Sequence, residues 1–348
     1  MYCCINCFKD PHICDTIKRF GTIGNCDFCS AKGTYVYNIK ETNPISDMIV
    51  SLVQVYSISD DDTAKLLKLS LREDWDIFNS GSEGIQTLVM ALCSNEANLD
   101  KELFEKNVII PQKYDEDFMN EYGVVKNLTW NEFSDYIKFS NRFHNDYFNG
   151  DAFASFLSMA VVSIKTDSCL FRARICHNTD GYETKDMYGP PKGKRTAGRI
   201  NPEEISVLYL SSNERTVLHE ARANVYDFVC IGTFKAKRDL KLVNLSNISK
   251  MSPFLYDGEI EQFAVNRNIF KDMVKEISKP LRRNESALEY LPTQFIAEFV
   301  KSQKYDGVVY ESTLCDSGYN IALFDESLVE CISVKTQEIT NIEYEFRH

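Results

Sequence analysis

Four cysteines near the start of the chain have a spacing that suits a metal ion. They form two Cys-x-x-Cys pairs, Cys4 with Cys7 and Cys26 with Cys29, and 18 residues separate the pairs. Each pair can present two thiolates from a tight turn, and two such pairs can close a tetrahedral Zn²⁺ site. Four thiolates leave no open position for a catalytic water, so the Zn²⁺ would be structural. The spacing therefore predicts a zinc ribbon over residues 1–35.

Three further side chains in this segment are also able to bind zinc. Cys3 could replace Cys4, His12 could replace one of the cysteines, and Cys14 is a spare thiol. The sequence leaves these alternatives open. A disulfide framework is disfavoured, because the chain starts without the pattern of a secretory signal and the cytoplasm keeps thiols reduced. We therefore expect a cytoplasmic protein.

Several segments of the C-terminal half occur in an order that is typical of one enzyme family. They are Phe171–Arg174, Met187–Pro191, Ala197–Pro202, Val207–Leu210, His219–Glu220, Leu291–Glu298, Asp306–Ser312 and Gly318–Phe324. In order and spacing these segments resemble the RES domain family, the toxins of bacterial toxin–antitoxin systems, over residues 166–335. The resemblance implies a fold similar to that of ADP-ribosyltransferases and an activity that cleaves the nicotinamide–ribose bond of NAD⁺.

The resemblance also implies roles for five residues. Arg172 matches the arginine of the family's first strand, and Arg199 matches the arginine that follows the small residues. Tyr209 matches the tyrosine of the central strand, Glu220 the glutamate eleven residues later, and Ser312 the late serine. Glu220, Tyr209 and Arg199 are the predicted catalytic residues. Substrate binding is predicted for Arg172, Arg199, Tyr209 and Ser312.

These residue types fit the chemistry without reference to the family. Breaking an N-glycosidic bond builds positive charge on the ribose ring, which the carboxylate of Glu220 would stabilise. Arg172 and Arg199 can each offer two aligned donors to a pyrophosphate. Tyr209 could stack on nicotinamide or orient the ribose. No Rossmann or P-loop glycine motif occurs in the sequence, so NAD⁺ is predicted to be a substrate and not a redox cofactor.

Hydrophobic periodicity indicates which elements position these residues. Apolar residues at helical spacing predict a mainly helical domain over residues 36–165, with helices at 45–56, 62–71, 85–93, 130–143 and 152–164. Beyond it, strands are predicted at 169–175, 206–211, 229–235, 240–245, 307–311 and 319–324, and helices at 213–226 and 291–304. This irregular mixture predicts an α+β fold, with a C-terminal tail or edge strand over residues 336–348.

Composition and charge exclude several classes of protein. The chain has 44% hydrophobic residues, which is typical of a folded globular protein. No apolar run approaches the roughly 18 residues that a membrane span needs. A net charge of −12 disfavours nucleic acid as a partner, because non-specific binding depends on clustered lysines and arginines. The small basic cluster Lys192–Arg195 suits a single phosphorylated ligand better than a polymer.

The sequence therefore predicts an NAD⁺-consuming, toxin-type enzyme that acts in bacterial growth arrest or phage defence. An NAD⁺ glycohydrolase or a phosphorolase fits best. An ADP-ribosyltransferase that modifies a protein uses the same chemistry, whereas a catalytically inactive zinc-containing binding module belongs to another class. Residues 36–165 resemble a HEPN-related domain that is fused to such enzymes. The resemblance implies a cognate antitoxin or an activating partner protein, neither of which the sequence identifies.

Overall fold

The computed structural model of the protein describes residues 1–40, 44–176, 179–279, 286–312 and 318–342. The chain divides into two compact units. Unit 1 comprises Met1–Asn127 and Met251–Ile269, and unit 2 comprises Leu128–Lys250 and Phe270–His348. Residues 128–165 of the expected helical domain thus belong to unit 2. The division of the sequence at residues 35, 165 and 335 stays a prediction.

None of the helices in the described ranges has the length and the apolar composition needed to cross a membrane.

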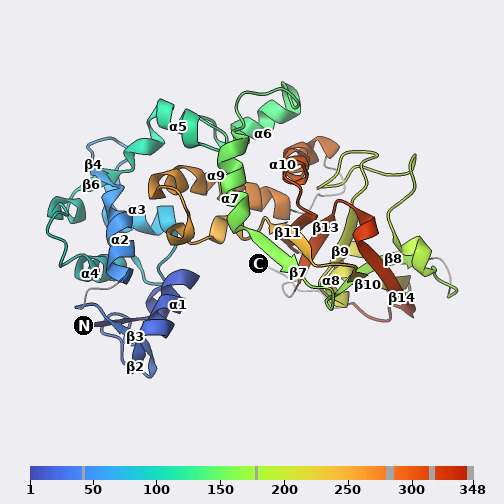
Figure 1. Ribbon diagram of the computed structural model, residues 1–348, viewed down its shortest axis with the longest axis horizontal. Coiled ribbons are helices and arrows are strands. Elements are labelled where there is room, and N and C mark those ends of the chain that lie inside the picture. Colours follow the sequence, from blue (N-terminus) through green and yellow to red (C-terminus); the bar gives the residue numbers. More distant parts are fainter. Residues whose placement is uncertain (41–43, 177–178, 280–285, 313–317, 343–348) are drawn as a thin grey trace. The chain divides into compact units, whose positions relative to one another are not determined.

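Unit 1 begins with a small antiparallel sheet that carries the cysteine pairs (Figure 1). Its strands, in the order β1-β3-β2, are β1 (Tyr2–Cys4), β3 (Thr34–Asn38) and β2 (Thr22–Gly24). Helix α1 (Pro11–Phe20) begins at Asp10, whose side chain accepts a hydrogen bond of 3.0 Å from the backbone N–H of Ile13. This cap and a proline in the first turn fix the start of the helix. The helix ends before Gly21, a position that requires glycine because a Cβ there would lie 2.3 Å from the carbonyl oxygen of Val36.

The rest of unit 1 is mainly helical. Its helices are α2 (Pro44–Gln54), α3 (Leu67–Trp75), α4 (Ser82–Leu92), α5 (Glu116–Tyr122) and the first half of α9 (Ile260–Ser278). A three-stranded sheet, in the order β4-β6-β5, contains β4 (Ser57–Ile58), β6 (Asn107–Ile109) and β5 (Lys65–Leu66). The helix predicted at 62–71 therefore starts too early, because Lys65 and Leu66 pair with β6. Within the core, the rings of Trp75 and Phe263 stack with their centroids 6.4 Å apart.

Unit 2 contains an eight-stranded mixed sheet, drawn from green to red in Figure 1. In spatial order its strands are β14 (Val329–Glu338), β10 (Phe228–Ala236), β8 (Cys169–Cys176), β9 (Leu208–Ser211), β13 (Tyr319–Leu323), β12 (Gly307–Glu311), β11 (Leu240–Asn244) and β7 (Val161–Ile164). Neighbours are antiparallel except for β11 and β12. The six predicted strands are confirmed to within two residues at each end, as is the α+β class.

Two segments of unit 2 differ from the sequence predictions. The helix predicted over 152–164 is two elements, α7 (Gly150–Met159) and β7, because residues 161–164 pair with β11. Periodicity alone did not reveal β14, in which exposed positions outnumber buried ones because it forms an edge of the sheet. Residues 336–338 of the predicted tail or edge strand lie in β14.

The sheet opens between β8 and β9. Every other pair of neighbouring strands has at least three residue pairs in register, whereas β8 and β9 share one, Phe171 with Ser211. Helix α8 (Glu214–Ala221) packs on both strands at this point. Side chains that project from the separating strands therefore face a gap and not a neighbouring strand.

An aromatic cluster packs helices α6 (Trp130–Phe139), α7 and α10 (Leu291–Ser302) together. Phe153 of α7 is fully buried, and its ring centroid lies 5.7 Å from that of Phe148 and 5.6 Å from that of Phe299. Phe295 of α10 meets Phe148 edge to face at 4.9 Å. Such aromatic contacts add to the apolar area that the cluster buries.

We expect Phe153→Ala to lower the free energy of unfolding of unit 2 by about 3 to 5 kcal/mol, because it leaves a cavity inside this cluster. Chemical denaturation followed by fluorescence measures the change. Phe139→Ala is the matched control, since that ring is 71% exposed and its loss should cost about 0.5 kcal/mol or less. Equal effects of the two substitutions would contradict this account of the core.

Candidate functional site

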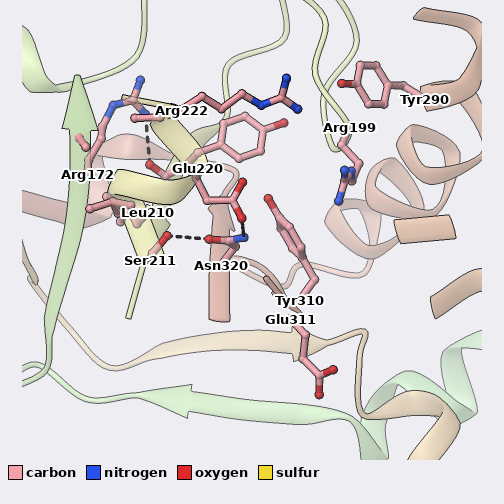
Figure 2. Close-up of a pocket in the computed structure, with 14 residues that line it drawn as sticks. Arg172, Arg199, Leu210, Ser211, Glu220, Arg222, Tyr290, Tyr310, Glu311 and Asn320 are labelled. Carbon is pink, nitrogen blue, oxygen red and sulfur yellow. Dashed lines mark hydrogen bonds between the residues drawn. The ribbon is translucent and has the colours of Figure 1, made fainter. Parts of the chain in front are cut away.

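A cleft of about 330 Å³ lies where β8 and β9 separate (Figure 2). Four of the five residues predicted from the sequence line it: Arg172, Arg199, Tyr209 and Glu220. The fifth, Ser312, does not line the cleft but contacts Glu220. The fold thus gathers residues that are up to 140 positions apart in the chain.

Two hydrogen bonds hold the carboxylate of Glu220. Its Oε1 accepts from the hydroxyl of Ser312 at 2.8 Å and from the side-chain amide of Asn320 at 2.7 Å. Asn320 is itself fixed, because its carbonyl oxygen accepts from the hydroxyl of Ser211 at 2.6 Å. Within the described residues, no hydrogen bond reaches Oε2 of Glu220. One carboxylate oxygen is therefore held in place while the other can meet a ligand.

Helix α8 places Glu220 at the cleft. Asn213 caps its first turn by accepting 2.9 Å hydrogen bonds from the backbone N–H and the hydroxyl of Thr216. Thr216 and Val217 are buried, which turns one face of the helix toward the sheet. The helix ends five residues earlier than predicted, because Arg222 has a left-handed backbone with φ 51°. Glu220 thus lies in the last turn, next to the cleft.

Arg172 projects from β8 into the gap in the sheet. Its Nη1 donates to the backbone carbonyl of Tyr209 at 3.2 Å, while its Nε is buried without a partner among the described residues. Burial lowers the pKa of Arg172 to about 10, and the nearby positive charge of Arg174 contributes to the shift. Arg172 therefore remains charged at neutral pH and has donor capacity left for an anion.

The hydroxyl of Tyr209 holds a loop that borders the cleft. It donates to the side-chain oxygen of Asn201 at 2.6 Å and accepts from the backbone N–H of Ile200 at 3.2 Å. Burial raises the pKa of Tyr209 to about 12. Gly198 is required beside it, because a Cβ would lie 2.6 Å from the tyrosine oxygen. Since the hydroxyl is occupied, the ring is the part of Tyr209 that can contact a ligand.

Arg199 is tied to the end of α9. Its guanidinium donates to the backbone carbonyls of Ile277 and, at 2.6 Å, Lys279. Its Cζ also lies 5.9 Å from the centroid of the Tyr310 ring. Cationic donors satisfy the carbonyls that a helix leaves unpaired at its C-terminus. Both terminal nitrogens of Arg199, which was predicted to bind phosphate, therefore already donate hydrogen bonds within the protein.

The first residues of α10 hold the loop that carries Arg199. The hydroxyl of Thr293 donates to the carbonyl of Arg199 at 2.7 Å, and the amide of Gln294 donates to the carbonyl of Gly198 at 2.7 Å. Both side chains are buried. These contacts join the segment Leu291–Glu298 to the loop that carries Arg199.

Comparison with known proteins gives a family for this part of the chain. The model of the RES domain matches residues 170–346, just over half of the sequence. The chain belongs to the RES domain family. No curated protein matches it.

A search of solved structures finds the M. tuberculosis MbcT–MbcA toxin–antitoxin complex. The matched chain is 12% identical, and the match covers 53% of the present chain and 90% of that chain with a TM-score of 0.30.

Several residues of the RES cleft were not singled out from the sequence. They are Ser211, Arg222, Tyr290, Tyr310 and Asn320. The sequence did mark Asn320, because it is a polar residue within the apolar pattern of β13. The structure shows that it is buried there. Ser211 and Tyr310 had no such signal, because a serine or a tyrosine in a strand is most simply explained by packing. Arg222 and Tyr290 lie outside the strands and had none either. Figure 2 shows the carboxylate of Glu220 beside Asn320 and Tyr310, while the side chain of Glu311 points away from the cleft.

The cysteine cluster of unit 1 fits a zinc ribbon. The Sγ atoms of Cys4, Cys7, Cys26 and Cys29 all lie within 4.8 Å of one another. Neighbouring sulfurs are 3.9 Å apart for Cys4 and Cys7 and 3.5 Å apart for Cys7 and Cys26. Four sulfurs bound at about 2.3 Å to one tetrahedral Zn²⁺ would lie about 3.8 Å apart. The four predicted thiols thus have the geometry of a closed metal site.

Neighbouring groups support the same arrangement. The backbone N–H groups of Phe28 and Cys29 point at the sulfur of Cys26, each at 3.4 Å. Burial raises the pKa of Cys4, so a cation is needed to keep it as a thiolate at neutral pH. Cys14 instead directs its thiol to the backbone carbonyl of Ile5 at 3.5 Å. Among the described residues, the set of thiols close enough to share one metal ion contains neither Cys3 nor Cys14, and His12 is also outside it.

We expect about one Zn²⁺ per purified chain, and we expect Cys26→Ser to lower the melting temperature of unit 1, because the site contributes folding free energy. Elemental analysis and calorimetry are the measurements. The exposed Cys169 of β8 provides the control, since Cys169→Ser removes a thiol without touching the cluster. A zinc-free protein with an unchanged melting profile would rule the site out.

We also expect Arg199→Ala to reduce the free energy of unfolding by about 1.5 to 3 kcal/mol, because it leaves two helix-end carbonyls without a charged donor. Denaturant titration measures the loss. Lys194→Ala removes an exposed positive charge from the same loop and should leave stability nearly unchanged. A stable Arg199→Ala protein would show that these two hydrogen bonds contribute little.

Proposed function

We propose that this RES domain protein is a cytoplasmic, NAD⁺-consuming enzyme of the toxin type that cleaves the bond between nicotinamide and ribose. One observation carries the proposal: a carboxylate, Glu220, is held by two donors inside a cleft that arginines also line. A fixed negative charge beside fixed positive charges suits a substrate that becomes cationic at one sugar and is anionic at its diphosphate.

For this reaction the protein needs to bind NAD⁺ and to place charged groups beside it. As the C1′–N bond of NAD⁺ breaks, the bonding electrons leave with nicotinamide, which departs as a neutral molecule. Positive charge moves from the pyridinium ring to the ribose, where Oε2 of Glu220 would stabilise it. Ser312 and Asn320 hold the other oxygen, so the carboxylate need not reorient during the reaction.

The acceptor completes the reaction and defines its name. Water gives ADP-ribose and releases one proton, which makes the enzyme an NAD⁺ glycohydrolase. Inorganic phosphate would make it a phosphorolase, and a protein side chain would make it an ADP-ribosyltransferase. The first two deplete the dinucleotide, which accounts for growth arrest without any further target.

A toxin of this type must be inhibited in the cell that produces it. We include in the proposal a cognate antitoxin, or a partner that activates the enzyme through the predicted HEPN-related segment, in growth arrest or phage defence. Unit 1 would then have a regulatory task, and the zinc ribbon a structural one. Co-expression of neighbouring genes with this chain, followed by affinity purification, tests for such a partner.

We expect Glu220→Gln to lower the rate of nicotinamide release about 10²- to 10³-fold, because it keeps the size of the side chain but removes its charge. Folding and most of the affinity for NAD⁺ should remain. Chromatographic detection of nicotinamide from purified protein and NAD⁺ is the measurement, and toxicity on expression should fall in parallel.

Glu214→Gln is the matched control. Glu214 lies in the first turn of the same helix and forms an ion pair with Lys335 on the surface. Near-wild-type turnover by the Glu220 variant would overturn the proposed role. Transfer of ADP-ribose to proteins of a lysate, detected by mass spectrometry, would instead identify a protein as the acceptor.

A further inference from the structure

Arg222 enters the RES cleft from the end of α8. It follows the helix directly, two residues after Glu220, and its side chain lines the cleft with Arg172. Figure 2 shows its guanidinium extended across the cleft, above the carboxylate of Glu220 in this view. Neither composition nor spacing draws attention to this residue, because a single arginine after a helix is ordinary.

The backbone of Arg222 is held in a conformation that favours glycine. Its φ of 51° and ψ of 40° are left-handed, at the position that ends α8. Helices commonly end at a glycine in this conformation, because a Cβ there is sterically disfavoured. An arginine at such a position carries a small backbone cost that a glycine would not carry.

The three arginines of the cleft are not equivalent. Arg199 already donates to two carbonyls at the end of α9, so its guanidinium holds the protein together. Arg172 makes one hydrogen bond, to Tyr209, and its Nε is buried without a partner among the described residues. Arg222 is an exposed side chain at the mouth of the same cleft. Arg172 and Arg222 both line the cleft, so both can reach an anion bound there.

We propose that Arg222, together with Arg172, binds the diphosphate of the substrate, and that Arg199 is a positioning residue that fixes the loop beside the cleft. The proposal rests on the proposed function, since it assigns the diphosphate of NAD⁺ to a place in the cleft. The two guanidinium groups come from a strand and a helix that pack together. They can therefore hold a diphosphate between them while Glu220 faces the ribose.

Arg222→Gly tests this role without the usual loss of stability. Glycine removes the guanidinium and suits the left-handed backbone, so the melting temperature should stay the same or rise. The dissociation constant for ADP, measured by isothermal titration calorimetry, should rise about ten- to a hundredfold, because a charged hydrogen-bond donor to phosphate is lost. Arg222→Asn, which also tolerates this backbone, serves as a second variant should the glycine alter the fold.

Arg215→Ala is the control, because Arg215 is an exposed arginine of the same helix that does not line the cleft. It should bind ADP as the unaltered protein does. Unchanged ADP affinity in both Arg222 variants, or equal weakening by the Arg215 variant, would overturn the proposal. The assay is independent of turnover. If the unaltered protein releases no nicotinamide yet ADP binding falls in the Arg222 variants, the proposed function fails and the diphosphate site stands.

Discussion

The hydrogen-bonded chain from Ser211 through Asn320 to Glu220 is the constraint on which the RES cleft depends. It joins the end of β9, the start of β13 and the last turn of α8 through side chains that are otherwise surrounded by apolar strands. Buried amides are costly unless both ends are satisfied, and here both are. Ser312 adds a second donor to the same carboxylate oxygen. These hydrogen bonds therefore fix the carboxylate of Glu220, whose second oxygen faces the cleft.

The gap between β8 and β9 leaves space for a ligand beside the carboxylate of Glu220. A sheet whose strands all pair fully leaves no gap for a ligand, whereas β8 and β9 pair at one position and then separate. Arg172 bridges part of the gap by donating to the carbonyl of Tyr209. The loop that carries Arg199 closes the side of the cleft, where Gln294 and the hydroxyl of Tyr209 hold it. These polar groups thus hold the shape of the cleft.

Different interactions stabilise the two units. Unit 2 has an apolar sheet core and a cluster of aromatic rings, which bury enough surface to hold its fold. The ribbon of unit 1 has strands of only three to five residues, and its four thiols have the geometry of a site at which a metal ion would cross-link them.

The sequence by itself determined the local features. Alternating apolar residues located six strands, the Cys-x-x-Cys pairs located the ribbon, and residue order located Arg172, Arg199, Tyr209 and Glu220 in the cleft. Tertiary structure decided which groups each residue contacts there. Arg199 caps α9 across 78 and 80 positions, and Ser312 reaches Glu220 across 92. The end of α8 places Arg222 at the cleft, beside the gap in the sheet. Such contacts depend on how distant segments pack, which periodicity and spacing along the chain do not encode.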